Sequence, residues 1–163
     1  MAKIPVDGNV KVTFFPTCAN IAAPSVTELT ATGALDIECF LTPDGLDESV
    51  AEDTKDTTVF CSTSNYEEPG RTMPSLQLTY FRGDVPATDD VSYTTLKRNT
   101  RGFLAIREGS PHATAWTAAD VCRVYTVMCG EQQPVKPAKN EDVKVQQKLY
   151  ASGDYERDAV AAA

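Results

Sequence analysis

The amino-acid sequence predicts a mainly β protein, built as a β-sandwich or partly open barrel with one α-helix inserted between two strands. Segments in which apolar and polar residues alternate recur along the chain. Threonine and valine, which favour strands, are plentiful. The 163 residues are enough for one hydrophobic core but not for two good ones. Residues 1–163 are therefore expected to form a single domain.

The N-terminal third predicts two strands separated by a loop. The first strand covers residues 10–15, and the second covers residues 34–42, which show the clearest two-faced pattern in the chain. Asp36 and Glu38 lie on the polar face of this second strand. Residues 24–32 contain several β-branched residues, so we expect a loop there with at most one helical turn.

Residues 43–74 predict a long segment with little regular structure. Its first half is acidic and reads as a solvated loop or mobile hairpin, and prolines and a glycine punctuate its second half. A short strand is expected at 57–62. Segments of this length inside a compact domain are usually functional or flexible, so this long loop is a candidate contact element.

The remainder of the chain predicts four strands and the inserted helix. The helix is expected at 89–99, with Asp89 or Asp90 as its N-cap and basic residues in its last turn. The segment 121–129 is apolar on both faces and predicts a central strand. The other three strands are expected at 75–81, 101–108 and 141–150. An N-terminal arm (1–9) and a C-terminal arm (131–163) complete the expected domain.

Composition and motifs argue against an enzyme. His112 is the single histidine and lies in a Ser-Pro turn, which indicates a surface histidine and not a catalytic triad. Cys122 and Cys129 are poorly spaced for zinc. Neither a calcium loop nor a nucleotide-binding glycine loop occurs. We therefore expect no catalytic residues, no cofactor and no metal.

Charge and cysteine usage bound the partners. The formal net charge of −8 disfavours a surface that grips DNA phosphates. The five scattered cysteines are interpreted as free thiols, with one or two disulfides in a secreted domain as the alternative. No apolar run has the length of a membrane span, so no membrane partner is expected.

The layout of strands and turns resembles the tail tube, or major tail, protein family of long-tailed, siphovirus-type bacteriophages. The resemblance covers roughly residues 8–150 and rests on the order of short motifs, none of which is diagnostic alone. These are Leu35-x-Ile37-x-Cys39-Phe40-Leu41-Thr42, Glu68-Pro69-Gly70, Leu76-x-Leu78-x-Tyr80, Gly102-Phe103-Leu104-x-Ile106-Arg107-Glu108-Gly109 and Cys129-Gly130.

This resemblance implies a structural subunit of the virion tail that is assembled in the host cytoplasm. It implies homohexameric rings in which strands of six subunits close a ring-wide β-barrel, stacked into a tube through which DNA passes without specific binding. Tape measure, tail terminator and tail tip proteins are the implied further partners. The acidity then has a use, because an acidic lumen repels DNA.

Two sets of residues are candidates for these roles. Asp36 and Glu38 are the lumen-facing candidates. The inter-ring contact candidates are the charged and aromatic residues of the long loop, namely Asp44, Asp47, Glu48, Glu52, Asp53, Tyr66 and Arg71.

Other functions stay open from sequence. A tail terminator, a head–tail connector and a type VI tube subunit also form rings. A stand-alone β-sandwich binding module for carbohydrate or adhesion is an alternative from a different class. Such a module needs an exposed aromatic platform, for which Tyr66, Tyr80, Phe81 and Trp116 are the candidates.

Overall fold

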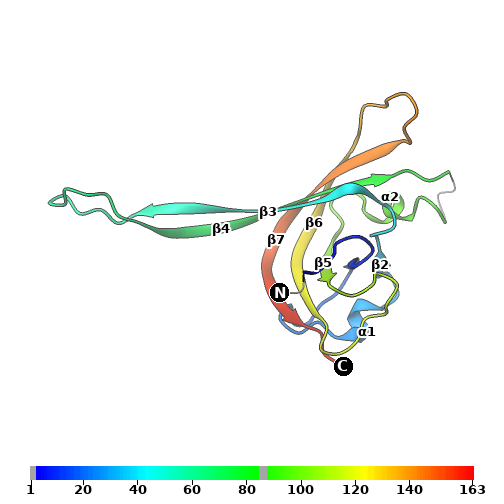
Figure 1. Ribbon diagram of the computed structural model, residues 1–163, viewed down its shortest axis with the longest axis horizontal. Coiled ribbons are helices and arrows are strands. Elements are labelled where there is room, and N and C mark those ends of the chain that lie inside the picture. The colour runs from blue at the N-terminus through cyan, green and yellow to red at the C-terminus, as the bar shows by residue number, and fades with distance from the viewer. Residues whose placement is uncertain (1–2, 85–87) are drawn as a thin grey trace.

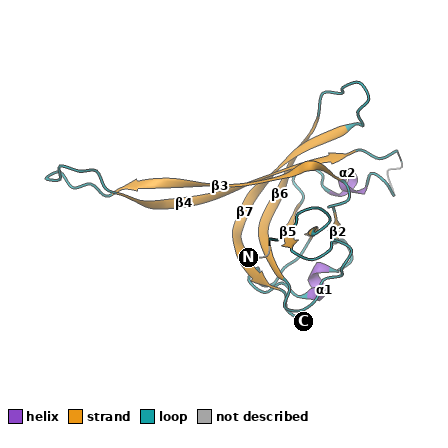
Figure 2. Cartoon of the chain, in the orientation of Figure 1, coloured by secondary structure: helices purple, strands orange, loops and turns teal. Residues whose placement is uncertain are grey.

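The computed structural model describes residues 3–84 and 88–163 (Figure 1). In this part of the chain one antiparallel sheet of seven strands runs in the order β2-β1-β5-β6-β7-β4-β3. The strands are β1 (Val10–Phe15), β2 (Leu35–Asp36), β3 (Leu41–Asp56), β4 (Glu67–Phe81), β5 (Arg101–Glu108), β6 (Val121–Pro134) and β7 (Lys144–Val160), and the helices are α1 (Val26–Leu29) and α2 (Val91–Thr95). Figure 2 shows how small the helical share is. The predicted mainly β class is confirmed, as one curved, open sheet.

The sheet buries apolar residues on both faces. Successive side chains of β1 enter two different cores on opposite faces of the sheet. Val12 and Phe14 belong to the larger core, and Phe15 belongs to the smaller one. The larger core also takes residues from β4, β5, β6 and β7 and is closed by Ile37 and Leu96. The smaller core is closed by Leu29 of α1 and by Trp116. β6 lies at the middle of the sheet, which confirms the predicted central strand.

Both helices are short because their sequences offer few apolar positions. The Ser25 side chain accepts from the Glu28 N–H, and the Glu28 carboxylate accepts from the Ser25 N–H. This capping box stabilises the single turn of α1. The predicted helix at 89–99 is much shorter than expected and occupies only Val91–Thr95. Its Asp90 N-cap residue makes no side-chain cap and instead binds Arg82 at 2.7 Å.

The predicted strand at 34–42 is wrong in its middle, because only Leu35–Asp36, as β2, and residues 41–42, as the start of β3, are strand. The chain leaves β2 after Asp36 and makes a turn in which the Phe40 N–H donates to the Ile37 carbonyl. Ile37 is fully buried while Cys39 is exposed, although the alternation placed both on the same face. The same alternation of apolar and polar residues is compatible with a turn, because Asp36 accepts a hydrogen bond from Lys11 and Glu38 accepts one from the Val12 N–H.

The expectation of little regular structure at 43–74 is also wrong, since most of the segment lies in β3 and β4, although the hairpin expected as an alternative for its acidic half is present. β3 and β4 form a hairpin whose paired residues run from Leu41↔Tyr80 to Asp56↔Glu67. The strand expected at 57–62 lies instead in the connection at the tip of this hairpin. Prolines are tolerated in β4 because an outer part of a hairpin has strand neighbours on one side only.

The C-terminal segment is not an arm. β7 runs from Lys144 to Val160 and pairs with both β4 and β6, well beyond the predicted end at residue 150. Ala159 and Ala161 are buried, and Ala162 forms an isolated bridge to Ser25. The strands predicted at 10–15 and 101–108 match β1 and β5 as observed. Among the described residues, no helix has the length and apolar character needed to cross a membrane.

Candidate assembly surface

The outer part of the β3–β4 hairpin projects away from the body of the molecule (Figure 1). We call residues 50–74 the arm. β4 pairs with β7 only from Ser75 onward, so within the arm the two strands have only each other as partners. All residues at 51–56 and 66–73 are exposed. An isolated two-stranded ribbon is marginally stable in water, which favours a partner for the arm.

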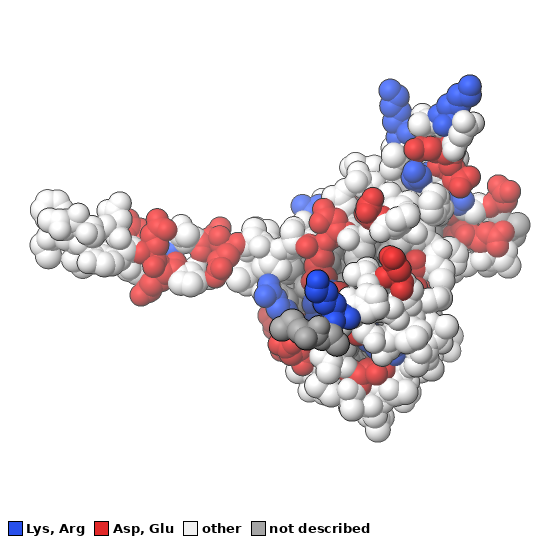
Figure 3. Space-filling model, viewed as in Figure 1, with Lys and Arg blue, Asp and Glu red and all other residues white. Residues whose placement is uncertain are grey.

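The arm exposes large apolar side chains as well as charge. Phe60 at its tip is fully exposed, and Val59, Tyr66 and Met73 are each more than half exposed. Exposed apolar groups concentrated on one protruding element mark an interaction surface. Acidic residues form bands along the arm in Figure 3, and the carboxylates there are Glu52, Asp53, Asp56, Glu67 and Glu68.

The predicted inter-ring contact residues divide into two groups in the structure. Six of them are exposed: Asp44 and Asp47 near the base of the hairpin, and Glu52, Asp53, Tyr66 and Arg71 on the arm. Glu48 differs, because its carboxylate is turned back onto β6. Its Oε2 accepts a hydrogen bond from Arg123 Nε at 3.2 Å, and its Oε1 accepts one from the Tyr125 hydroxyl.

These contacts of Glu48 anchor the hairpin to the body. Arg123 also donates to Glu108 at 2.7 Å, and this hydrogen bond holds the pKa of Glu108 below its usual value. Burial, with the hydrogen bond to Glu48, raises the pKa of Tyr125. Tyr125 therefore stays neutral at neutral pH and donates its hydroxyl proton to the Glu48 carboxylate. The arm thus leaves the body from a fixed point.

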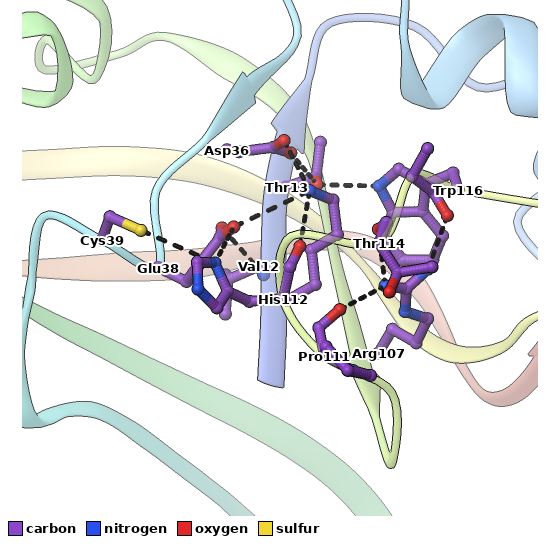
Figure 4. A network of polar contacts seen from close by, with 12 residues as sticks. Val12, Thr13, Asp36, Glu38, Cys39, Arg107, Pro111, His112, Thr114 and Trp116 are labelled. Carbon is purple, nitrogen blue, oxygen red and sulfur yellow. Dashed lines mark hydrogen bonds and ion pairs between the residues drawn. The ribbon is translucent and has the colours of Figure 1, made fainter. Parts of the chain in front are cut away.

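The predicted lumen residues Asp36 and Glu38 lie in a polar network beside Thr13 and His112 (Figure 4). Lys11 Nζ lies 2.6 Å from Asp36 Oδ2 and 3.7 Å from Glu38 Oε1. The Asp36 side chain is 47% exposed, whereas that of Glu38 is 12% exposed and accepts from the Val12 N–H. Asp36 therefore keeps more contact with solvent than Glu38 does.

A second polar group next to this network holds the loop before β6. Arg107 is almost fully buried and donates to Asp120 Oδ2 at 2.8 Å and to the Thr114 carbonyl at 2.8 Å. Burial raises the pKa of Asp120, but the hydrogen bond from the Thr117 N–H and the bond to Arg107 outweigh it and hold this pKa below its usual value. Because the positive charge of Arg107 is enclosed by protein, these contacts stabilise the fold and are not open to a ligand.

The aromatic platform of a carbohydrate-binding module is not present at the predicted residues. Trp116 is buried and donates from Nε1 to the Thr13 hydroxyl at 3.0 Å. Tyr80 is buried, and this burial raises its pKa to about 12. Phe81 is half-buried beside the base of the hairpin, so only Tyr66 of the four stands free on the surface.

His112 lies close to two side chains that sequence reasoning did not connect with it. Its Nδ1 lies 3.7 Å from Cys39 Sγ and 3.7 Å from Glu38 Oε1. Cys39 and His112 are 73 positions apart, so no spacing in the sequence signals this group. All five cysteines are free thiols, and burial raises the pKa of both Cys122 and Cys129 to about 11.

Comparison with known proteins decides the family. A model of the family described as "Phage tail tube protein" matches residues 1–163. The chain belongs to this family. It is accordingly a structural, non-enzymatic subunit of the phage tail tube and a component of the virion. No curated protein sequence matches the tail tube chain significantly.

A solved structure shares the fold of this tail tube protein. The chain is similar to one in the structure described as "Cryo-EM structure of the anti-feeding prophage (AFP) baseplate, 6-fold symmetrised", with a TM-score of 0.54 and 13% identity over 96% of each chain. Identity at this level supports likeness of fold alone.

Proposed function

We propose that the chain assembles into hexameric rings that stack into a tube for DNA, and that the arm makes the contact between rings. The arm carries the proposal, because it exposes Val59, Phe60, Tyr66 and Met73 on a ribbon whose two strands pair only with each other. The AFP baseplate, whose structure contains a chain of this fold, is six-fold symmetrised, and this symmetry suggests six subunits in each ring.

The open sheet supports closure between subunits. Its outermost strands are β2 and β3, and an unpaired strand edge is a template for pairing with another chain. Head-to-tail pairing that closes gives a ring with no free edges. A ring-wide β-barrel therefore uses the edges that a single subunit leaves open.

The test of the arm is Phe60→Asp in the purified protein. A fully exposed phenylalanine that becomes buried in a contact contributes about 1.5–3 kcal/mol, and each subunit in a ring repeats that contact. We expect the variant to remain folded, with an unchanged melting temperature, but to form no tubes by negative-stain microscopy.

The matched control is Thr63→Asp, which adds the same charge in the same tip connection without removing an apolar group. It should assemble as the unsubstituted protein does. Tubes of normal length from the Phe60→Asp protein would contradict the role of the arm.

We also propose that Asp36 and Glu38 face the lumen. Six copies of a net charge of −8 give a ring a formal charge of −48, and only carboxylates within about 8–10 Å of the DNA repel it strongly. Asp36, being 47% exposed, carries most of this effect.

The corresponding experiment measures DNA ejection by the parent phage carrying Asp36→Asn with Glu38→Gln. Both substitutions keep side-chain size and remove charge, so slower ejection is expected. Asp142→Asn, at an exposed position between β6 and β7, is the control. Ejection at the unsubstituted rate in the double variant would count against a lumen position.

The finer assignment to long-tailed, siphovirus-type phages is part of the proposal and rests on the motif layout. It implies tape measure, terminator and tip proteins as partners of the tube. A long tail without a contractile sheath in micrographs of the parent virion is the expected result. A sheathed tail would overturn this assignment and leave membership in the tail tube family intact.

A further inference from the structure

Glu38, Cys39 and His112 bring three kinds of metal-binding atoms together on the wall of a groove. A carboxylate oxygen, a thiol sulfur and an imidazole nitrogen lie within 4.8 Å of one another. Figure 4 shows the three side chains converging from two separate segments of the chain. The groove has a volume of about 900 Å³ and also borders the base of the β3–β4 hairpin at Leu46 and Phe81.

The distances between these atoms fit a tetrahedral zinc ion. Zinc binds sulfur at about 2.3 Å and nitrogen or oxygen at about 2.0–2.2 Å, so its ligands in a tetrahedral site lie about 3.4–3.6 Å apart. Nδ1 of His112 is 3.7 Å from Cys39 Sγ and 3.7 Å from Glu38 Oε1. The imidazole of His112 is therefore placed to share an ion with either of the other two side chains.

The backbone holds the ligand-bearing segments in place. The turn that carries Glu38 and Cys39 is closed by the bond from the Phe40 N–H to the Ile37 carbonyl. Both backbone polar groups of His112 are hydrogen-bonded. Its N–H donates to the Gly8 carbonyl, and its carbonyl accepts from Lys11 Nζ. The site is thus largely formed in the folded protein.

Local charge also favours a divalent cation. Asp36 and Glu38 lie beside the single positive charge of Lys11, and a thiolate at Cys39 adds a third negative group next to Glu38. Asp36 lies closest to Lys11, which leaves Glu38 available to a second cation. A doubly charged ion makes the cluster formally neutral.

We propose that Glu38, Cys39 and His112 form a zinc-type metal site with its fourth position open to the groove. A thiolate, an imidazole and a carboxylate are a ligand set suited to zinc and to cobalt(II) as its substitute. Binding displaces the thiol proton of Cys39 to solvent, so affinity rises with pH. The ion joins the turn after β2 to the loop after β5 and stabilises the fold.

The experiment titrates the purified, metal-free full-length protein with Co²⁺ and then displaces it with Zn²⁺. One Co²⁺ per chain with a thiolate-to-metal charge-transfer band is expected, and Zn²⁺ should abolish that band and raise the melting temperature. Loss of an outer-shell partner weakens metal binding about 10–100-fold, so loss of a direct ligand in Cys39→Ser or His112→Gln should weaken it at least about 100-fold.

The matched control is Cys61→Ser, because Cys61 is also an exposed thiol but lies at the tip of the arm. This variant should bind Co²⁺ as the unsubstituted protein does. Absence of a thiolate band in the unsubstituted protein would overturn the proposal. So would a band that survives in Cys39→Ser or disappears in Cys61→Ser. Since His112 and Cys39 are not buried, both substitutions leave a folded protein on which binding can be measured.

Discussion

At the scale of single residues, the enclosed charge of Arg107 is the most demanding feature of the body. Its side chain is 2% exposed, and its guanidinium donates to Asp120 and to backbone carbonyls of the loop that follows β5. Removing one partner of a buried pair leaves an uncompensated charge, which costs more than the pair contributes. These residues therefore hold the loop between β5 and β6 against the sheet.

This pairing predicts a specific pH dependence of stability. The pKa of Asp120 is lower in the folded protein than the ordinary value of 3.8, so the ionised carboxylate stabilises the fold above that pH. That contribution is lost as the pH falls through the lowered pKa. The free energy of unfolding in urea should therefore fall as the pH drops below 3.8, and less steeply in Asp120→Asn than in the unsubstituted protein.

Asp142→Asn, at an exposed position, should retain the full pH dependence of the unsubstituted protein. Identical slopes for Asp120→Asn and the unsubstituted protein would show that Asp120 does not carry the effect.

Sequence reasoning found some residues and missed others for physical reasons. The exposed acidic residues of the hairpin were predictable, because charge alone indicates a solvated surface. The inward turn of Glu48 was not, because its partner Arg123 lies 75 positions away in β6. The cluster of Glu38, Cys39 and His112 escaped for the same reason, since only the folded chain brings the turn after β2 beside the loop after β5.

At the scale of elements, the outer parts of β3 and β4, which form the arm, are the strands that the sequence did not predict. Alternation of apolar and polar residues reports a strand with one buried face. The arm has no buried face within the single chain, so its strand residues show no alternation of apolar and polar side chains and are predicted as a loop. β1 and β5 were predictable because each packs on the core. The long reach of β7 was missed because residues 151–158 are largely exposed.

The base of the hairpin depends on a close approach at Gly45. An irregularity in the pairing of β3 and β4 lies between Leu41 and Leu46, and a Cβ at Gly45 would stand 2.2 Å from the Thr79 carbonyl oxygen. Because the clashing atoms are backbone, the strand itself must shift. Gly45→Ala should lower the free energy of unfolding by about 2 kcal/mol, which urea denaturation measures.

Ser49→Ala lies in the same strand at an exposed position and should change stability by less than about 0.5 kcal/mol. Equal stability of the Gly45→Ala and unsubstituted proteins would mean that the two strands do not approach each other as closely as described.

At the scale of the whole molecule, two features point outward from the single chain. The sheet is open at β2 and β3, and the arm carries exposed apolar residues beyond the body. The net charge of −8 keeps single subunits soluble while they await assembly. A tail tube subunit needs each of these properties, because it must stay dispersed, then close laterally and stack along an axis.

The most direct measurement of this account is a cryo-EM helical reconstruction of tubes formed by the purified protein. We predict six subunits in each ring, with the arm of one ring seated on the next and Phe60 buried in that contact. Tubes in which the arm lies free in solvent, or rings with another number of subunits, would contradict the proposed assembly.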